Sequence, residues 1–451
     1  MNSHLRLHTG CLLVQLLFLT AIPYSRADDL LSVFQLAEQS DPQYQAAIAA
    51  HSAALEVVPQ SIAALLPDLS LSGDVSRNRF HNRTPLARED KNTYATNKIY
   101  SARLRQSIYH RDRFIKLKQA NSQVAQADAT LVAARQDLVQ RTATRYFLVL
   151  GAMDNLTFVR ADKAAIARTL DQAKQRFEVG LSAITDVYDA QSRYDVAVSD
   201  EINAEKLLDD AHEALRELTG EVPGDLEVLK PEIPLLAPEP ADTEQWVTTA
   251  AEQNPLLLAA REATETARQE IQVQRSGHYP SMDLTADYRR SNIQFGGSFP
   301  QKRNDSSIGI EITVPLYQGG LVSSQTRQAS ELFTQAQEEQ VQQRRKVERQ
   351  ARNSYHGVLA GSSKVKALKQ ATLSSAKALE ASEAGFKVGT RTIVDVLDSQ
   401  RELLRARRDY ARSRYDYLLD TLKLKQAAGI ADTTDLEQIN DLLETAQQNS
   451  P

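Results

Sequence analysis

The feature that most constrains the fold is an internal duplication of almost the whole chain. The segment FEVGLSAITDVYDAQ at 177–191 returns as FKVGTRTIVDVLDSQ at 386–400, with eight of fifteen positions identical. Further pairs follow in the same order: SDPQYQAAIAAHSAAL from 40 with QNPLLLAAREATETAR from 253, and LRELTG from 215 with LKQAAG from 424. The offset drifts only between about 208 and 213 residues, and such ordered self-similarity means that one structural unit is used twice. The chain is therefore predicted to fold as two similar halves.

The ends of the two halves are marked by composition. A weakly basic start, the apolar run CLLVQLLFLTAI and the small residues of Ser25-Arg26-Ala27 predict a secretory signal peptide that is cleaved after Ala27. A single anchor helix is the alternative, but the apolar run is short for a membrane span. Cys11 lies inside this leader, so the exported chain is predicted to contain no cysteine and no disulfide. The predicted segments are a signal peptide 1–27, a first repeat 28–221, a proline-rich linker 222–242, a second repeat 243–429 and a tail 430–451.

Each repeat is predicted to contain a helix, two short strands, a very long helix and a return helix. We expect helices over about 29–66, 112–178 and 184–219 in the first repeat, and over 320–387 and 393–428 in the second. Val124, Leu131 and Leu138 recur every seven residues, which indicates coiled-coil packing. A helix of about 65 residues is on the order of 100 Å long. Long helical hairpins are thus the predicted main architecture.

The strands alternate apolar and polar residues. Ile308, Ile310 and Ile312 alternate with Gly309 and Glu311, and the other three strands follow the same pattern. A soluble sandwich would alternate too, but the polar face is charged in every strand, and polar loops at 77–98 and 289–305 are expected at one end only. Both traits are typical of outer-membrane barrels. Four strands cannot close a barrel, so a membrane sheet would require oligomerisation.

Several classes of function find no support in the sequence. The net charge of −5 offers no basic footprint for nucleic acid. His110-Arg111-Asp112 resembles a kinase catalytic loop, but Leu117 stands where asparagine is needed, and the tripeptide is expected at a junction between a strand and a helix. We find no phosphate-binding glycine loop and no histidine pair at metal-ligand spacing. No catalysis, cofactor or metal is predicted.

The chain resembles the TolC family of trimeric outer-membrane exit ducts over nearly all of its exported length. The most specific motifs are GHYPSMDLTA (277–286), VPLYQGG (314–320) and VGTRTIVDVLD (388–398), the last with its echo VGLSAITDV (179–187). The resemblance implies a mainly α homotrimer, with a 12-stranded β-barrel in the bacterial outer membrane continuous with a 12-helix barrel in the periplasm. It also implies a passive duct for proteins, drugs or both. Its partners would be a periplasmic adaptor and an inner-membrane transporter of the ABC or RND type. The rival hypothesis is a periplasmic coiled-coil adaptor or tether without a pore.

The resemblance also assigns roles to the repeated segment. Asp395 and Asp398 share one helical face at a spacing of three. Two solvated acids near a helix N-terminus are the ordinary interpretation. By resemblance they form an acidic constriction in the trimer, where mutual repulsion should raise some of their pKa values. By the same resemblance, Arg391 is expected to hold the entrance closed through contacts with Thr185 and Asp186. Phe386 stands where the family has a tyrosine. The residues expected to contact the adaptor are Val179, Gly180, Leu181, Val388, Gly389 and Thr390.

Overall fold

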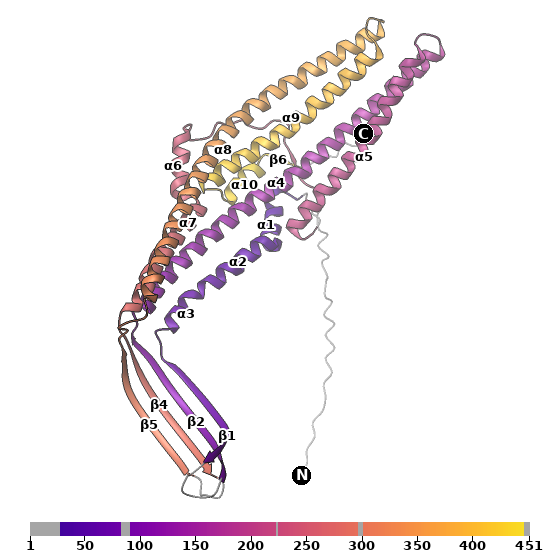
Figure 1. Cartoon of the computed structure of the whole chain (residues 1–451). Coiled ribbons are helices and arrows are strands. Elements are labelled where there is room, and N and C mark those ends of the chain that lie inside the picture. Colours follow the sequence, from indigo (N-terminus) through magenta and orange to yellow (C-terminus); the bar gives the residue numbers. More distant parts are fainter. Residues whose placement is uncertain (1–27, 83–90, 222–223, 296–300, 446–451) are drawn as a thin grey trace, which may run out of the picture.

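The structure of the chain is a computed structural model that describes residues 28–82, 91–221, 224–295 and 301–445. The predicted signal peptide 1–27 lies outside the described residues, as do residues 446–451 of the predicted tail. The described chain is long and narrow, with a β-sheet at one end and two helical hairpins at the other (Figure 1). No helix in the described ranges combines the length and the apolar character needed to cross a membrane.

Two hairpins of long helices make up most of the molecule. The first joins α4 (Arg111–Glu178) to α5 (Ile184–Thr219), and the second joins α8 (Leu321–Lys387) to α9 (Ile393–Ala428). α4 has 68 residues and α8 has 67. Each is therefore on the order of 100 Å long at the usual rise per residue. The predicted long helices and their return helices are confirmed, and both hairpins end in neighbouring tips (Figure 1).

The predicted single helix over 29–66 is wrong, because three helices occupy this stretch: α1 (Leu30–Ser40), α2 (Pro42–Leu55) and α3 (Val57–Ala63). The first break lies at Asp41, whose side chain accepts the backbone N–H of Tyr44 at 2.9 Å and so caps α2. Pro42 has no N–H to donate, which suits the first position of a helix. The second repeat uses the same device, since Asn254 caps α7 (Pro255–Arg275) after α6 (Thr243–Gln253).

The sheet contains four antiparallel strands in the order β1-β2-β4-β5. The strands are β1 (Asp68–Asn82), β2 (Lys91–Tyr109), β4 (Ser281–Phe295) and β5 (Gln301–Thr313). The long loops predicted at 77–98 and 289–305 are wrong, because the strands run through most of both ranges. Contacts between side chains of neighbouring strands stabilise these polar ends of the strands. For example, the guanidinium of Arg77 on β1 lies 5.2 Å from the ring centre of Tyr94 on β2.

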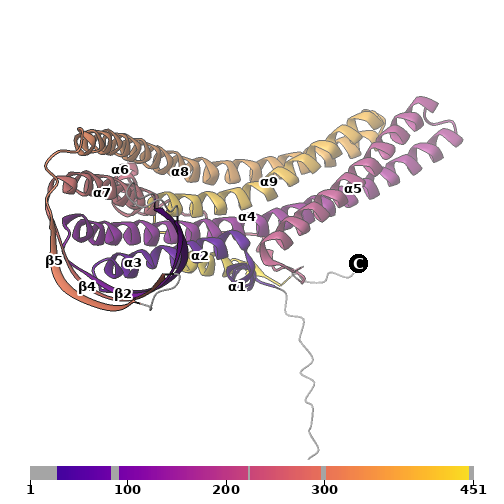
Figure 2. The same ribbon diagram turned by 60° about the horizontal axis from the view of Figure 1, so that its bottom comes forward.

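One face of the sheet is apolar and exposed, as the predicted alternation requires. A single row of cross-strand neighbours joins Leu69, Leu104, Ala286 and Ile308 across all four strands. Leu69 is 70% exposed and Ile308 is 76% exposed. The sheet is also strongly curved, and Figure 2 shows it as an arc beside the ends of the helices. A curved sheet with one bare apolar face has to meet an apolar surrounding.

The sheet meets the helices through a buried carboxylate. Asp283 of β4 has a side chain that is only 5% exposed. It accepts a hydrogen bond from Arg105 of β2 at 2.8 Å, and the Nε2 atom of His110 lies 3.0 Å from it. A buried carboxylate is tolerated only with such partners. His110 occupies the N-cap position of α4, so the tripeptide that begins there is a junction, as predicted.

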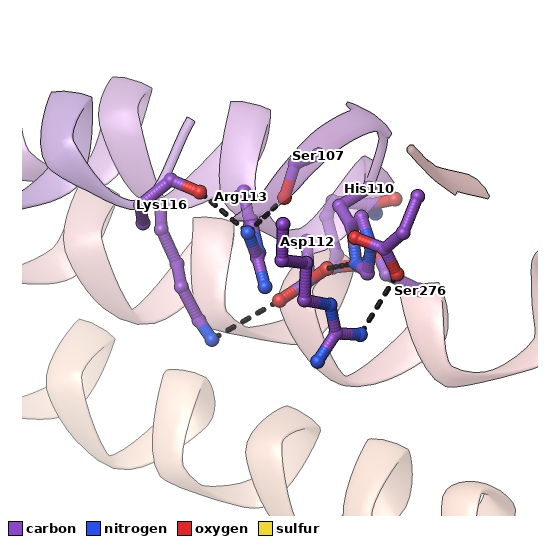
Figure 3. Close-up of polar contacts among 10 residues, drawn as sticks. Ser107, His110, Asp112, Arg113, Lys116 and Ser276 are labelled. Carbon is purple, nitrogen blue, oxygen red and sulfur yellow. Dashed lines mark hydrogen bonds and ion pairs between the residues drawn. The ribbon is translucent and has the colours of Figure 1, made fainter. Parts of the chain in front are cut away.

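The first turns of α4 add further polar contacts at this junction. Figure 3 shows Lys116 donating to Asp112, one turn earlier on the same helix, and Arg113 donating to Ser107 of β2. The sheet is therefore held to α4 by side chains from both elements, which fixes the direction in which the long helix leaves the sheet.

A belt of short elements packs against the middle of the helices (Figure 1). It consists of α1, α10 (Thr433–Asn440), the segment 224–242 and residues 430–445, with β3 (Val228–Leu229) paired to β6 (Leu443–Glu444). Tyr146 of α4 is fully buried there and donates its hydroxyl to the carbonyl of Glu227 at 2.8 Å. Phe147 stacks on Tyr415 of α9 with ring centres 5.4 Å apart. The largest hydrophobic core of the chain lies at this level, where both hairpins pass.

Candidate functional site at the hairpin tips

The two turns predicted as adaptor contacts form the exposed tips. Gly180 and Gly389 have φ values of 76° and 82°, which side chains with a Cβ rarely adopt. Beside them, Val179 and Leu181 are each 69% exposed, and Val388 is 74% exposed. Both tips therefore present a tight turn with apolar side chains directed to the surroundings.

The second tip closes onto Gly385, as the first closes onto Arg176 through the N–H of Leu181 at 2.8 Å. The backbone N–H of Thr390 donates to the carbonyl of Gly385 at 2.9 Å. A Cβ on Gly385 would lie 2.6 Å from Cγ of Arg391, so only glycine lets the turn close onto this side chain. This close approach fixes Arg391 at the beginning of α9.

Asp395 completes a capping box in the first turn of α9. Thr392 is the N-cap of α9, and its backbone N–H donates to Asp395 Oδ2 at 2.8 Å, while the N–H of Asp395 donates to Thr392 Oγ1 at 3.2 Å. The bond from the Thr392 backbone, and a second bond that the Thr392 hydroxyl donates to Oδ2 at 2.8 Å, lower the pKa of the Asp395 carboxyl. The mutual repulsion predicted from the sequence would require further copies of the chain. Within one chain the pKa moves in the opposite direction.

Asp398 shares a helical face with Asp395 but has different partners. Its Oδ1 atom lies 3.0 Å from Nη2 of Arg193 on α5 and 3.1 Å from Nη2 of Arg401 on α9. The Asp398 side chain is 46% exposed, and the Asp395 side chain is 39% exposed. Both acids can therefore face solvent while holding cationic partners.

Sequence reasoning missed Arg193. At the offset of the repeat, the position equivalent to Arg193 is Glu402, so the charge is reversed between the two copies. The reversal marks Arg193 as a cation that the second copy lacks, and this difference was the available signal.

The predicted link from Arg391 to Thr185 and Asp186 is not among the contacts of the described tips. Arg391, which directly precedes the N-cap of α9, instead lies 3.6 Å from Asp395 of the same hairpin. Thr185 and Asp186 lie in the first turn of α5. Any role of Arg391 in joining the hairpins therefore remains a proposal.

Phe386 does contact the other hairpin, although it has no hydroxyl group to donate a hydrogen bond. The guanidinium carbon of Arg176 on α4 lies 4.8 Å from the centre of the Phe386 ring on α8. A cation over an aromatic face at this distance is attracted by the electron density of the ring. An apolar cluster packs behind this contact, formed by Ile166, Leu170, Ala173, Ala190, Ala197, Ile393 and Leu397. The tips of the two hairpins are thus held against each other by mixed apolar and charged contacts.

The comparisons with known proteins agree with this geometry. The family model described as outer membrane efflux protein matches residues 33–221 and 246–430. The chain belongs to the outer membrane efflux protein family. Within this family, the outer membrane protein TolC of Vibrio cholerae is 39% identical over 425 residues, which cover 94% of this chain and 95% of that protein.

A second relative is the alkaline protease secretion protein AprF of Pseudomonas aeruginosa, which is 27% identical over 415 residues, 91% of this chain and 86% of that protein. The solved structure of the CmeC outer membrane channel of Campylobacter jejuni matches with a TM-score of 0.75 at 15% identity, over 92% of this chain and 90% of that chain. The predicted resemblance to the TolC family is confirmed. The chain is an outer-membrane efflux or secretion channel with the mainly α fold of this family, and relatives of this kind fit a protein without catalysis.

Proposed function

We propose that three copies of the chain form a passive duct that crosses the outer membrane and reaches into the periplasm. Each copy contributes its four strands to a twelve-stranded barrel. Each also contributes α4, α5, α8 and α9 to a twelve-helix barrel. An inner-membrane transporter of the ABC or RND type would deliver proteins, drugs or both, through a periplasmic adaptor that contacts the tips.

The open sheet is the observation that carries this proposal. Within the described residues, β1 and β5 form its two edges. On its apolar face, Leu71 is 81% exposed and Ile308 is 76% exposed. An unpaired strand edge in lipid costs several kcal/mol for each unsatisfied backbone group. Pairing β1 of one copy with β5 of the next would satisfy both edges, and the curvature seen in Figure 2 favours such closure.

The same arrangement would place Asp395 and Asp398 of three copies around one axis. Six carboxylates at a narrow entrance would attract cations, and a trivalent cation would bridge several of them and block the path. Arg391, Phe386, Thr185 and Asp186 would surround this entrance and take part in opening it.

The alternative is a periplasmic coiled-coil adaptor or tether without a pore. Such a protein would stay soluble without detergent and would cover the apolar face of its sheet. The exposure of Leu71 and Ile308 counts against this alternative, because a soluble monomer rarely exposes an apolar patch of this kind.

Single-channel recording in a planar bilayer tests the proposal. The wild-type protein should give discrete current steps that a trivalent cation blocks from the helical side. Asp395→Ala combined with Asp398→Ala should abolish this block and weaken cation selectivity. Glu213→Ala combined with Glu217→Ala removes the same charge from exposed positions of α5 and should keep the block.

Two outcomes would contradict the proposal in different ways. If the cation blocks the wild-type protein and the Asp395/Asp398 variant equally, the protein is a channel but these residues do not form its acidic ring. A protein that stays soluble without detergent and gives no current steps would favour the periplasmic tether.

A further inference from the structure

We infer that the ion pair between Arg193 and Asp398 couples the cation selectivity of the entrance to its opening. This inference rests on the proposed trimeric duct. In the closed tip Arg193 compensates the charge of Asp398, and separation of the hairpins exposes that charge. The entrance would then prefer cations more strongly when it is open than when it is closed.

The pair is placed to sense separation because it joins the two hairpins. Arg193 belongs to α5 of the first hairpin, and Asp398 belongs to α9 of the second, with Nη2 and Oδ1 3.0 Å apart. Arg160 makes a similar contact with Glu201 at 3.2 Å, but both residues lie within the first hairpin. Moving one hairpin away from the other would break the first pair and leave the second intact.

The two acids of the entrance would respond differently to this movement. The partners described for Asp395, namely Thr392 and Arg391, precede it by three and four positions and travel with it. Asp398 would lose Arg193 and retain only Arg401 of its own helix. Each copy would therefore lose one of the two cations beside Asp398 when the hairpins part.

The two halves differ at only one member of this pair. The counterpart of Asp398 in the first half is Asp189, and the counterpart of Arg193 in the second half is Glu402. The acid is therefore common to both halves, whereas the cation belongs to the first half alone. The attraction between the hairpins at this point depends on that cation.

The size of the effect follows from the exposure of the pair. The Arg193 side chain is 36% exposed and that of Asp398 is 46% exposed. Ion pairs with this degree of exposure change an equilibrium by a factor of about two to five. If three copies open together, these factors multiply to roughly tenfold to a hundredfold. A change of this size in the open fraction is measurable in single-channel records.

The test compares four variants of the full-length protein in planar bilayers under a salt gradient. Arg193→Gln and Asp398→Asn should each raise the open fraction by about tenfold or more. Their reversal potentials should move in opposite directions, toward stronger cation selectivity in Arg193→Gln and toward weaker selectivity in Asp398→Asn. The exchange Arg193→Asp with Asp398→Arg should restore a low open fraction, and Arg160→Gln should behave as the wild type does.

The possible failures can be told apart. If the wild-type protein gives no current steps, the proposed duct itself is wrong. If it does but Arg193→Gln keeps the wild-type open fraction and reversal potential, the duct stands and the coupling is wrong. Shifts of the reversal potential in the same direction for both single variants, or an equal effect of Arg160→Gln, would mean general loosening of the tips and would also overturn the inference.

Discussion

Replacement of Gly429 by alanine should destabilise the chain far more than the same change at another glycine of equal conformation. Gly429 ends α9 with a φ of 82°. A Cβ there would lie 2.5 Å from the carbonyl oxygen of Gln253 and 2.6 Å from Cα of Asn254. The left-handed conformation costs alanine about 1 kcal/mol. Overpacking against backbone that cannot rotate away adds about 2 kcal/mol or more.

Two other glycines separate these contributions. Gly389 has the same φ of 82°, but no atom lies within 4 Å of its Cβ position. Its replacement should cost only the conformational term of about 1 kcal/mol. Gly220, the counterpart of Gly429 in the first half, has a φ of 78° and would place its Cβ 3.4 Å from that of Ser40. Gly220→Ala should therefore fall between the other two variants.

Thermal unfolding followed by circular dichroism in detergent would rank the three variants. At about 2–4 °C per kcal/mol, Gly429→Ala should lower Tm by roughly 6–12 °C and Gly389→Ala by roughly 2–4 °C. A Gly429→Ala protein as stable as Gly389→Ala would refute the argument, because it would show that the loop of residues 253–254 yields to the new methyl group without cost.

Three further predictions concern the tips and the sheet. Phe386→Leu should raise resting conductance in bilayers, because loss of the ring beneath Arg176 removes about 0.5–1 kcal/mol of attraction between the hairpins, whereas Phe386→Tyr should not. Because the folded pKa of Asp395 is lowered, its stabilisation of α9 is present above the ordinary carboxyl pKa of 3.8 and is lost as pH falls through the lower folded value. The block by a trivalent cation should be measured over a range of pH. As the pH falls, the block should be lost at a higher pH in Thr392→Val than in the wild type. Leu71→Arg should reduce the fraction recovered in the outer membrane, whereas Ser70→Arg on the opposite face should not; equal recovery would contradict the orientation of the sheet.

The long helices could be predicted because their apolar residues repeat every seven positions over many helical turns. Val124, Leu131 and Leu138 indicated α4, and Gly180 and Gly389 marked the ends of α4 and α8. The extent of the strands could not be predicted, because the ladder beyond Val75 is supported by cross-strand partners that are distant in sequence, such as Arg77 with Tyr94. A search for alternating apolar residues does not detect such pairs.

The candidate site was predictable in its location but not in its contacts. The doubled segment identified the tips and the two acids, since both copies carry the same pattern. The contact between Arg193 and Asp398 depends on how one hairpin lies against the other, which neither segment encodes alone. The break at Asp41 could have been predicted from the sequence, because an acid at the N-cap followed by proline is a local signal for the start of a new helix.

The pairing of β3 with β6 imposes an order on the biogenesis of the chain. Lys230 and Asp441, which meet beside these strands, are 211 positions apart. A chain that emerges from its export machinery with its N-terminus first has therefore released both hairpins before the belt can close. Chains cut short before Asp441 would leave β3 without its partner and Lys230 without the carbonyl of Asp441. Closure of the belt thus distinguishes a completed chain from an unfinished one.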